Sequence, residues 1–433
     1  MEAHTMPQAP PQHVEDMVEL VEEILLRLPP DEPDSLVRAA VVCKPWCSLI
    51  SSHRFRRLYR DFHKTPPMLG FFHNLWTLSP DCDRLTPRKP LFTSPSTKGF
   101  SPLYPEGNYF VYDCRHGRVL LEKRCDDDST EEDLDNNGCM KFLVWDPMTG
   151  SQWPLVAPDQ RACWWHGAAV LCAVDGCDHG ACHMGPFLVV YISIDEYEDG
   201  GEGAWVYVYS SKTSKWRERA SIPLITMETG HCIETDSLVL VAEAFYCLVT
   251  LTYPKEAPQV VKYDLGDNSL SVFKVPPMVA DSSHISPAVL TAEDAGLGLA
   301  HLDMFSLRMW SYDDGVAEWT HHRVIDLKML LPIGDHMISP KVVGSVEGTH
   351  TIFVATDLGV HMIDLSSLTS RNEGHNLQLS QKIYSMVGRR VDCIFPYVYD
   401  RPVVTARRTV STGEGAASVR RSKRTRRPNP RYL

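Results

Sequence analysis

The first sixty residues carry apolar side chains at helical spacing. From 17 to 28 the apolar positions recur at steps of three and four, with acidic residues and one arginine between them. This pattern predicts an amphipathic helix, and the two prolines that follow it end the helix because proline lacks a backbone donor. Asp34 or Ser35 can cap a second helix, and a third begins near Pro45 and continues to Phe62. The pattern therefore predicts a three-helix module.

A module of this size encloses a thin core and often gains stability from a partner. Its apolar residues leave two alternatives open. The helices either form a cap that packs on the following domain, or they dock on a separate protein.

A different pattern begins after His63, where short apolar segments alternate with turn residues. It predicts an all-β region. The recurring unit is a strand that ends in an aromatic and a polar residue, a turn, and a returning strand that begins at an aromatic, which together make a hairpin. The clearest copy is 142–147 followed by Trp153. The equivalent anchors are Trp145, Tyr209, Tyr263, Trp310 and Ile363, spaced 47 to 64 residues apart.

A period near fifty residues fits a four-stranded propeller blade with variable loops. The segment 68–400 would hold roughly six to eight such blades. Apart from Gly200-Gly201 in a loop, the sequence lacks the glycine doublets of kelch repeats, and its single Trp145-Asp146 pair is not repeated as it would be in WD repeats. A β-sandwich pair or an irregular sheet domain remains the alternative. The fold class expected is mostly β, with a small all-α module at the amino-terminal end.

The charge is unevenly distributed along the chain. The net charge is −12, yet 401–433 holds ten Lys or Arg and one acid, so the remainder carries −21. An acidic body disfavours nucleic acid as a partner. The tail contains six bases within eight positions, which favour a nuclear import signal: Arg420, Arg421, Lys423, Arg424, Arg426 and Arg427. Solvating charge is the alternative, and the segment is too polar to fold.

The sequence shows no pattern for export or membrane insertion. Residues 1–13 are polar and rich in proline, and the longest apolar run, 238–251, contains Glu243. The thirteen cysteines are then expected as free thiols in a reducing compartment. We expect a soluble protein of the nucleus and/or the cytoplasm, with no membrane partner.

One region is rich in potential metal ligands, which could hold zinc tetrahedrally. Paired C-x-x-C knuckles are missing from it, and a glycine-rich loop between strands explains the segment without a metal. Signatures of metalloproteases, serine hydrolases, phosphate loops and dinucleotide sites are also missing. We therefore expect no metal, no cofactor and no catalytic residues. The potential ligands are Cys163, His166, Cys172, Cys177, His179, Cys182 and His183.

The helical segments 20–29, 36–39 and 42–50 resemble an F-box, and the resemblance covers 17–62. The family usually opens this motif with Leu-Pro, where this chain has Met17 and Val18. The resemblance implies binding to a Skp-type adaptor and, through it, to a cullin scaffold. Carried over by position, the adaptor-facing residues are Met17, Leu20, Ile24, Leu25, Leu28, Pro29, Leu36, Val41, Val42, Cys43 and Trp46.

The β region in turn resembles plant F-box proteins with an irregular F-box-associated β-propeller. The matching segments are 65–71, 113–120, 144–147 and 177–179. These motifs are short and mainly structural, so they indicate the fold and the family and leave the substrate open.

These observations divide the chain into a disordered start at 1–13, an F-box at 14–63, a propeller-like substrate-recognition domain at 64–400 and a basic disordered tail at 401–433. The expected function is that of a non-catalytic substrate-recognition subunit of an SCF-type (Skp, cullin, F-box) ubiquitin ligase. Two alternatives stay open: a propeller enzyme with a helical cap, and an F-box interaction protein that works outside any ligase.

Overall fold

The computed structural model describes most of the chain between residues 14 and 398. The predicted disordered start and the basic tail lie outside the described residues. Among the described residues, no helix is both long and apolar enough to span a membrane. The described segments are 14–28, 33–63, 68–74, 76–78, 85–87, 90–94, 101–124, 141–158, 165–177, 179, 182–196, 202–224, 233–235, 238–251, 258–280, 287–292, 294–332, 340–347, 349–356, 358–372 and 393–398.

The amino-terminal module contains four helices where the sequence pattern predicts three. The predicted third helix is interrupted at Ser51 and Ser52, because the Ser52 hydroxyl accepts a hydrogen bond from the Phe55 backbone N–H at 3.1 Å and starts a new helix. The apolar spacing runs through this break, so periodicity does not reveal it. The helices are α1 (Val14–Leu26), α2 (Pro33–Ala40), α3 (Lys44–Ile50) and α4 (His53–His63).

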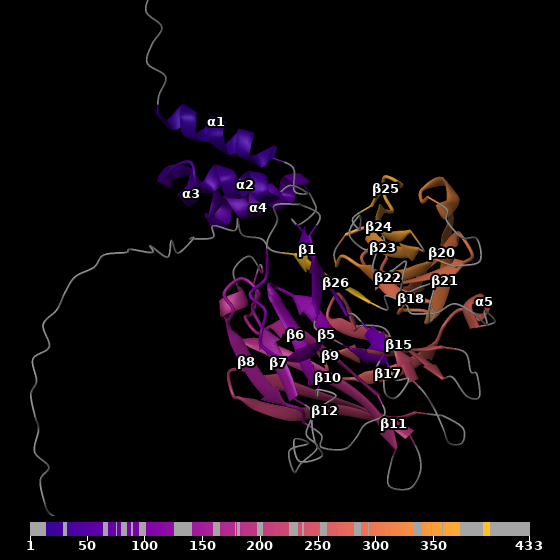
Figure 1. The fold of residues 1–433 in the computed structure, drawn as a ribbon. Helices are drawn as coiled ribbons and strands as arrows, with labels where there is room; N and C mark the ends of the chain where they lie inside the picture. Colours follow the sequence, from indigo (N-terminus) through magenta and orange to yellow (C-terminus); the bar gives the residue numbers. More distant parts are fainter. Residues whose placement is uncertain are drawn as a thin grey trace, which may run out of the picture. The chain divides into compact units, whose positions relative to one another are not determined.

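The remainder of the described chain is almost entirely antiparallel sheet (Figure 1). Each of the first five blades is a run of antiparallel strands consecutive in sequence. The first two blades are β5 (Asn108–Arg115), β6 (Arg118–Arg124), β7 (Lys141–Trp145) and β8 (Gln152–Val156), then β9 (Trp165–Cys172), β10 (Phe187–Glu196), β11 (Glu202–Ser210) and β12 (Lys215–Leu224).

The next three blades follow the same order, with one additional strand in the third. The third is β13 (Ile233–Thr235), β14 (Val239–Val241), β15 (Ala244–Leu251), β16 (Gln259–Asp264) and β17 (Leu270–Lys274). The fourth is β18 (Ala288–Thr291), β19 (Leu297–Asp303), β20 (Ser306–Asp313) and β21 (Glu318–Asp326). The fifth is β22 (Lys341–Ser345), β23 (Thr351–Thr356), β24 (Gly359–Asp364) and β25 (Thr369–Asn372).

The sixth blade joins two distant parts of the chain. Its strands are β1 (Met68–His73), β4 (Leu91–Thr93) and β26 (Ile394–Val398), and β1 lies between the other two. Phe72 pairs with Phe395 across the ladder. A separate ribbon pairs β2 (Trp76–Leu78) with β3 (Leu85–Pro87), and three short helices lie in connections: α5 (Pro277–Ala280), η1 (Cys182–Met184) and η2 (Leu327–Met329).

The blades are held together by apolar clusters between neighbouring sheets. Each interface can be represented by one pair of residues, beginning with the interface between the sixth blade, which closes the ring, and the first. The pairs are Phe72 with Trp145, Phe142 with Tyr191, Ile192 with Phe245, Tyr246 with Leu299, Leu307 with Val354, and Phe353 with Phe71. The last pair returns to the sheet that holds the first, so the sheets form a closed ring. Over the described residues this is a six-bladed β-propeller, at the lower end of the predicted range.

The hairpins between the last two strands of the first, third and fifth blades share a local arrangement. The Asp146 side chain accepts backbone N–H bonds from Met148 and Thr149, and Asp264 and Asp364 do the same in later blades. An aspartate at this position stabilises the turn, because its carboxylate accepts hydrogen bonds from the backbone N–H groups two and three residues later. The predicted repeat of strand, polar residue and turn is thus confirmed as a repeated hairpin.

Candidate functional site

The helices of the amino-terminal module surround a core of their own. Tyr59 ties α4 to the end of α1, because its hydroxyl donates to the Leu28 carbonyl at 2.7 Å; His63 Nε2 lies 2.7 Å from the Leu26 carbonyl oxygen. The interior side chains are Leu25, Leu36, Ala39, Ala40, Ile50, Phe55 and Tyr59.

Several apolar side chains of this module remain in solvent. On α1, Leu20 is 57% exposed and Ile24 is 52% exposed, whereas Leu25 is 2% exposed. Burial of one such side chain is worth roughly 1.5–3 kcal/mol, so a partner helix would gain by covering them. Val18, exposed on the same helix, was not among the predicted residues. It occupies the place where the F-box family usually has proline.

The eleven predicted adaptor-facing residues fall into four groups. Leu20, Ile24, Val41, Val42 and Cys43 are exposed, and Leu28 and Trp46 are half-buried against the module core. Leu25 and Leu36 are interior, so we assign them to the core instead of the surface. Met17 belongs to α1, but its side chain is outside the described residues, as is the whole of Pro29.

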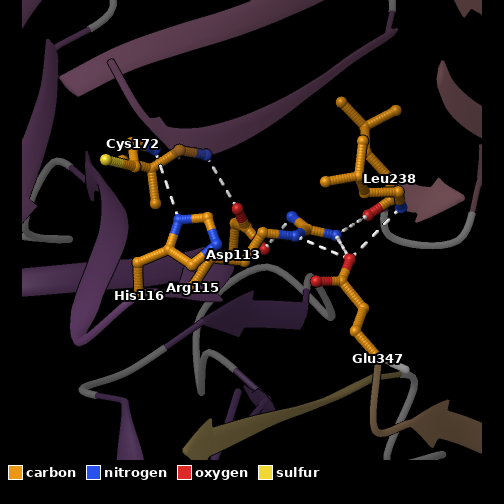
Figure 2. A network of polar contacts seen from close by, with 8 residues as sticks. Asp113, Arg115, His116, Cys172, Leu238 and Glu347 are labelled. Carbon is orange, nitrogen blue, oxygen red and sulfur yellow. Dashed lines mark hydrogen bonds and ion pairs between the residues drawn. The ribbon is translucent and has the colours of Figure 1, made fainter. Parts of the chain in front are cut away.

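A buried polar network links four blades of the propeller (Figure 2). Arg115, at the end of β5, contacts Asp113 of its own strand and donates to Glu347 of the fifth blade at 2.7 and 2.8 Å. It also donates to the Leu238 carbonyl, next to β14, at 2.8 Å. Asp113 accepts a bond from the Val170 N–H of β9 at 2.7 Å. The first, third and fifth blades therefore meet at one guanidinium, and the second joins the network through Asp113.

The charges in this network are set by burial and by their partners. Burial raises the pKa of Asp113 to about 6, and Arg115 opposes that shift. Burial lowers the pKa of Arg115, but the Asp113 and Glu347 carboxylates outweigh it and raise that pKa well above its usual value. Arg115 therefore stays charged and connects the blades through ion pairs and hydrogen bonds. Asp113 and Arg115 lie in the segment 113–120 that matches the family, whereas no local sequence pattern predicts a role for Glu347.

The structure gathers four of the seven potential metal ligands and separates a fifth. The ligand atoms of Cys172, Cys177, His179 and Cys182 all lie within 4.8 Å of one another. The fifth, His166, lies elsewhere on β9, with Nε2 2.6 Å from the Tyr112 hydroxyl and 3.6 Å from a Glu122 carboxylate oxygen. Cys163 and the side chain of His183 are outside the described residues.

Comparison with known families covers both parts of the chain. An F-box domain model matches residues 18–58, and a model described as "F-box protein AT5G49610-like, beta-propeller" matches residues 110–339, more than half of the chain. This chain is a member of that F-box protein family. The F-box match includes every predicted adaptor-facing residue except Met17, which lies one position before it. The predicted resemblance to F-box proteins with an associated propeller is confirmed.

Solved structures resemble this F-box protein distantly. A putative 6-phosphogluconolactonase from Bacteroides fragilis is 9% identical over 70% of this chain and 80% of its own, with a TM-score of 0.37. A protein of unknown function from Bacteroides caccae is 12% identical over 77% and 99%, also at 0.37, and the Pseudomonas aeruginosa periplasmic gluconolactonase PpgL is 9% identical over 70% and 93%, at 0.34. No curated protein matched the chain. Similarities this weak carry no argument about activity.

Proposed function

We propose that this F-box protein is the substrate-recognition subunit of an SCF-type ubiquitin ligase. In this proposal the F-box binds a Skp-type adaptor, and through it a cullin scaffold, while the propeller holds a target protein. The observation that supports it best is the division of α1 into an interior Leu25 and an exposed Leu20 and Ile24 within the F-box match. An apolar face that the module does not cover itself is suited to a partner.

The proposed subunit performs no bond chemistry. Holding a substrate on the scaffold raises the effective concentration of its lysines near the charged ubiquitin-conjugating enzyme. The rate then depends on the affinity of the two interfaces and on the distance between them. The target would meet the propeller through exposed loops, and its identity is left to experiment.

The adaptor interface is tested by co-purification of the full chain with a Skp-type adaptor and a cullin. The double variant Leu20→Glu with Ile24→Glu places two charges on exposed positions of α1, so the module can still fold. We expect adaptor affinity to fall at least about tenfold, because each charge would be desolvated on binding. Val316→Glu, at an exposed apolar position of the propeller, is the matched control and should bind as the unmutated chain does.

Three outcomes separate the functions that the sequence leaves open. Adaptor and cullin captured by the unmutated chain and lost with the double variant support the ligase subunit. Adaptor without cullin supports an F-box interaction protein outside the ligase, and capture of neither removes the ligase proposal. Proteins retained by a chain whose F-box is deleted, compared with the full chain, would identify targets.

We also propose that the basic cluster Arg420 to Arg427, outside the described residues, directs nuclear import. Its support is the density of charge in the sequence. A reporter fused to 401–433 should accumulate in the nucleus, and replacing the six bases by alanine should abolish this. A cytoplasmic reporter would count against import.

A further inference from the structure

Three cysteines and one histidine converge where the second blade begins. Cys172 is the last residue of β9, and Cys177, His179 and Cys182 follow in the connection to β10, Cys182 within η1. Their four ligand atoms lie within 4.8 Å of one another. The spacing matches no paired knuckle, so the cluster is a product of the fold of this loop.

The distances in the cluster are close to those of a tetrahedral metal site. His179 Nδ1 lies 3.7 Å from Cys182 Sγ. Zinc bonds of about 2.3 Å to sulfur and about 2.0 Å to nitrogen place tetrahedral ligands roughly 3.5–3.8 Å apart. A small contraction of the loop would therefore seat an ion among the four atoms.

Backbone donors point at two of the sulfurs. The His179 N–H donates to Cys177 Sγ at 3.4 Å, and the Val174 N–H does the same for Cys172. In both cases the donor lies two residues after the cysteine. These bonds hold two of the sulfurs in place from the backbone, as outer contacts do in protein metal sites.

A buried arginine lies beside the cluster. Arg118 is fully buried, and Nη2 donates to the Cys182 carbonyl and, at 2.6 Å, to the Gly185 carbonyl. Its Nε and Nη1 have no hydrogen-bond partner among the described residues. Zn²⁺ with three thiolates and a neutral imidazole would carry one negative charge, which this guanidinium offsets.

His116 supports the histidine ligand from outside. Its ring stacks on His179 with 3.9 Å between centroids and 11° between planes, and its Nδ1 accepts from the Cys172 N–H at 3.2 Å (Figure 2). One side chain thus contacts two of the four residues. Residues that hold ligands in this way are a usual part of protein metal sites.

We propose that Cys172, Cys177, His179 and Cys182 bind one Zn²⁺ as a structural site. Four protein ligands leave no open position for a substrate, so the ion would fix the connection between β9 and β10 and have no part in catalysis. The proposal replaces the expectation, drawn from sequence spacing, that the chain holds no metal. It is independent of the F-box and of ligase assembly.

The test is metal analysis of the full chain, purified under reducing conditions. We expect about one zinc per chain, and tetrahedral thiolate spectra when Co²⁺ replaces it. Cys177→Ser and His179→Ala should each lose the metal, whereas Cys43→Ser, at an exposed cysteine of the helical module, should keep it. His116→Ala and Arg118→Met should weaken zinc affinity by about 10- to 100-fold.

The conservative variant His179→Cys distinguishes loss of a ligand from misfolding of the chain. It should retain one metal per chain and strengthen the thiolate-to-cobalt absorption, which requires a folded site. The proposal is overturned if the reduced chain takes up neither Zn²⁺ nor Co²⁺. It is equally overturned if Cys177→Ser and His179→Ala, folded by circular dichroism, keep as much zinc as Cys43→Ser.

Discussion

The Glu347 carboxylate receives the Arg115 guanidinium at 2.7 and 2.8 Å, although 232 residues separate the two in sequence. The same carboxylate accepts the Leu240 N–H at 3.3 Å. Glu347 therefore joins the fifth blade to the first and to the third. These contacts can form only when the first, third and fifth blades have all assembled into the ring.

Removing this carboxylate should destabilise the propeller. In Glu347→Ala, Arg115 keeps Asp113 and the Leu238 carbonyl but loses its partner in the fifth blade. We expect the free energy of unfolding to fall by about 1.5–3 kcal/mol, as for other hydrogen bonds to charged groups, measured by urea titration. Asp303→Ala, which removes an exposed ion pair with Arg308, is the control and should cost less than about 1 kcal/mol. Equal losses would show that the buried network contributes no more than a surface pair.

Two tryptophans fasten the outer edges of neighbouring blades. The Trp216 indole N–H, on β12, donates to the Val156 carbonyl at 2.7 Å, and that of Trp319, on β21, donates to the Lys274 carbonyl at 2.9 Å. Trp216→Phe and Trp319→Phe keep an aromatic ring and lose the donor. Each should lower stability by about 1 kcal/mol in thermal or urea unfolding.

The matched control for these tryptophans is Trp153, on β8 of the first blade. No hydrogen bond of its indole is found among the described residues, so Trp153→Phe should be milder than the other two. A loss at Trp153 as large as at Trp216 would mean that ring size, and not the hydrogen bond, decides the effect.

Acid should weaken the closing blade through His73. Burial lowers the pKa of His73 from 6.5 to about 4, and its Nδ1 has no hydrogen-bond partner among the described residues. The unfolded chain binds this proton below pH 6.5, while the folded chain takes it up near pH 4. Stability contributed by neutral His73 is thus complete above pH 6.5 and is lost as the pH falls to 4, by about 3 kcal/mol in all.

Urea titrations between pH 7 and 4 measure this loss. His73→Leu cannot titrate and should show a shallower decline, whereas His350→Leu, at an exposed histidine, should follow the unmutated chain. Parallel curves for all three proteins would assign the acid sensitivity to other groups.

Substitutions at interior and exposed positions of α1 should affect the stability of the F-box module and its adaptor binding differently. Leu25→Ala leaves a cavity in the core and should cost about 2–5 kcal/mol of module stability. Leu20→Ala, at an exposed position of the same helix, should leave stability within about 0.5 kcal/mol and weaken adaptor binding. Thermal unfolding and adaptor titration of both variants measure the two effects. If Leu20→Ala unfolds the module, Leu20 belongs to its core.

The repeating part of the fold could be predicted because each blade restates the same local pattern. The anchors Trp145, Tyr209, Tyr263, Trp310 and Ile363 lie on β7, β11, β16, β20 and β24. In every case this is the strand that pairs with the outermost strand of the blade. Alternating apolar residues and turn chemistry are short-range signals, so the sequence alone carries them.

The closing blade, the polar network and the thiol cluster could not be predicted in the same way. Phe72 and Phe395 belong to one sheet through a pairing that no repeat spacing contains. Glu347 is an ordinary acidic residue until the ring brings Arg115 to it. The ligand set from Cys172 to Cys182 lacks a familiar spacing, and its convergence depends on how the loop folds.

The pairing of β1 with β26 has a consequence for the order of events during synthesis. β1 leaves the ribosome roughly 320 residues before its partner strand. At translation rates of about 5–20 residues per second, one edge of β1 waits roughly 15 to 65 seconds for the strand that covers it. Exposed strand edges pair readily with other chains, so the nascent protein is prone to aggregation during this interval.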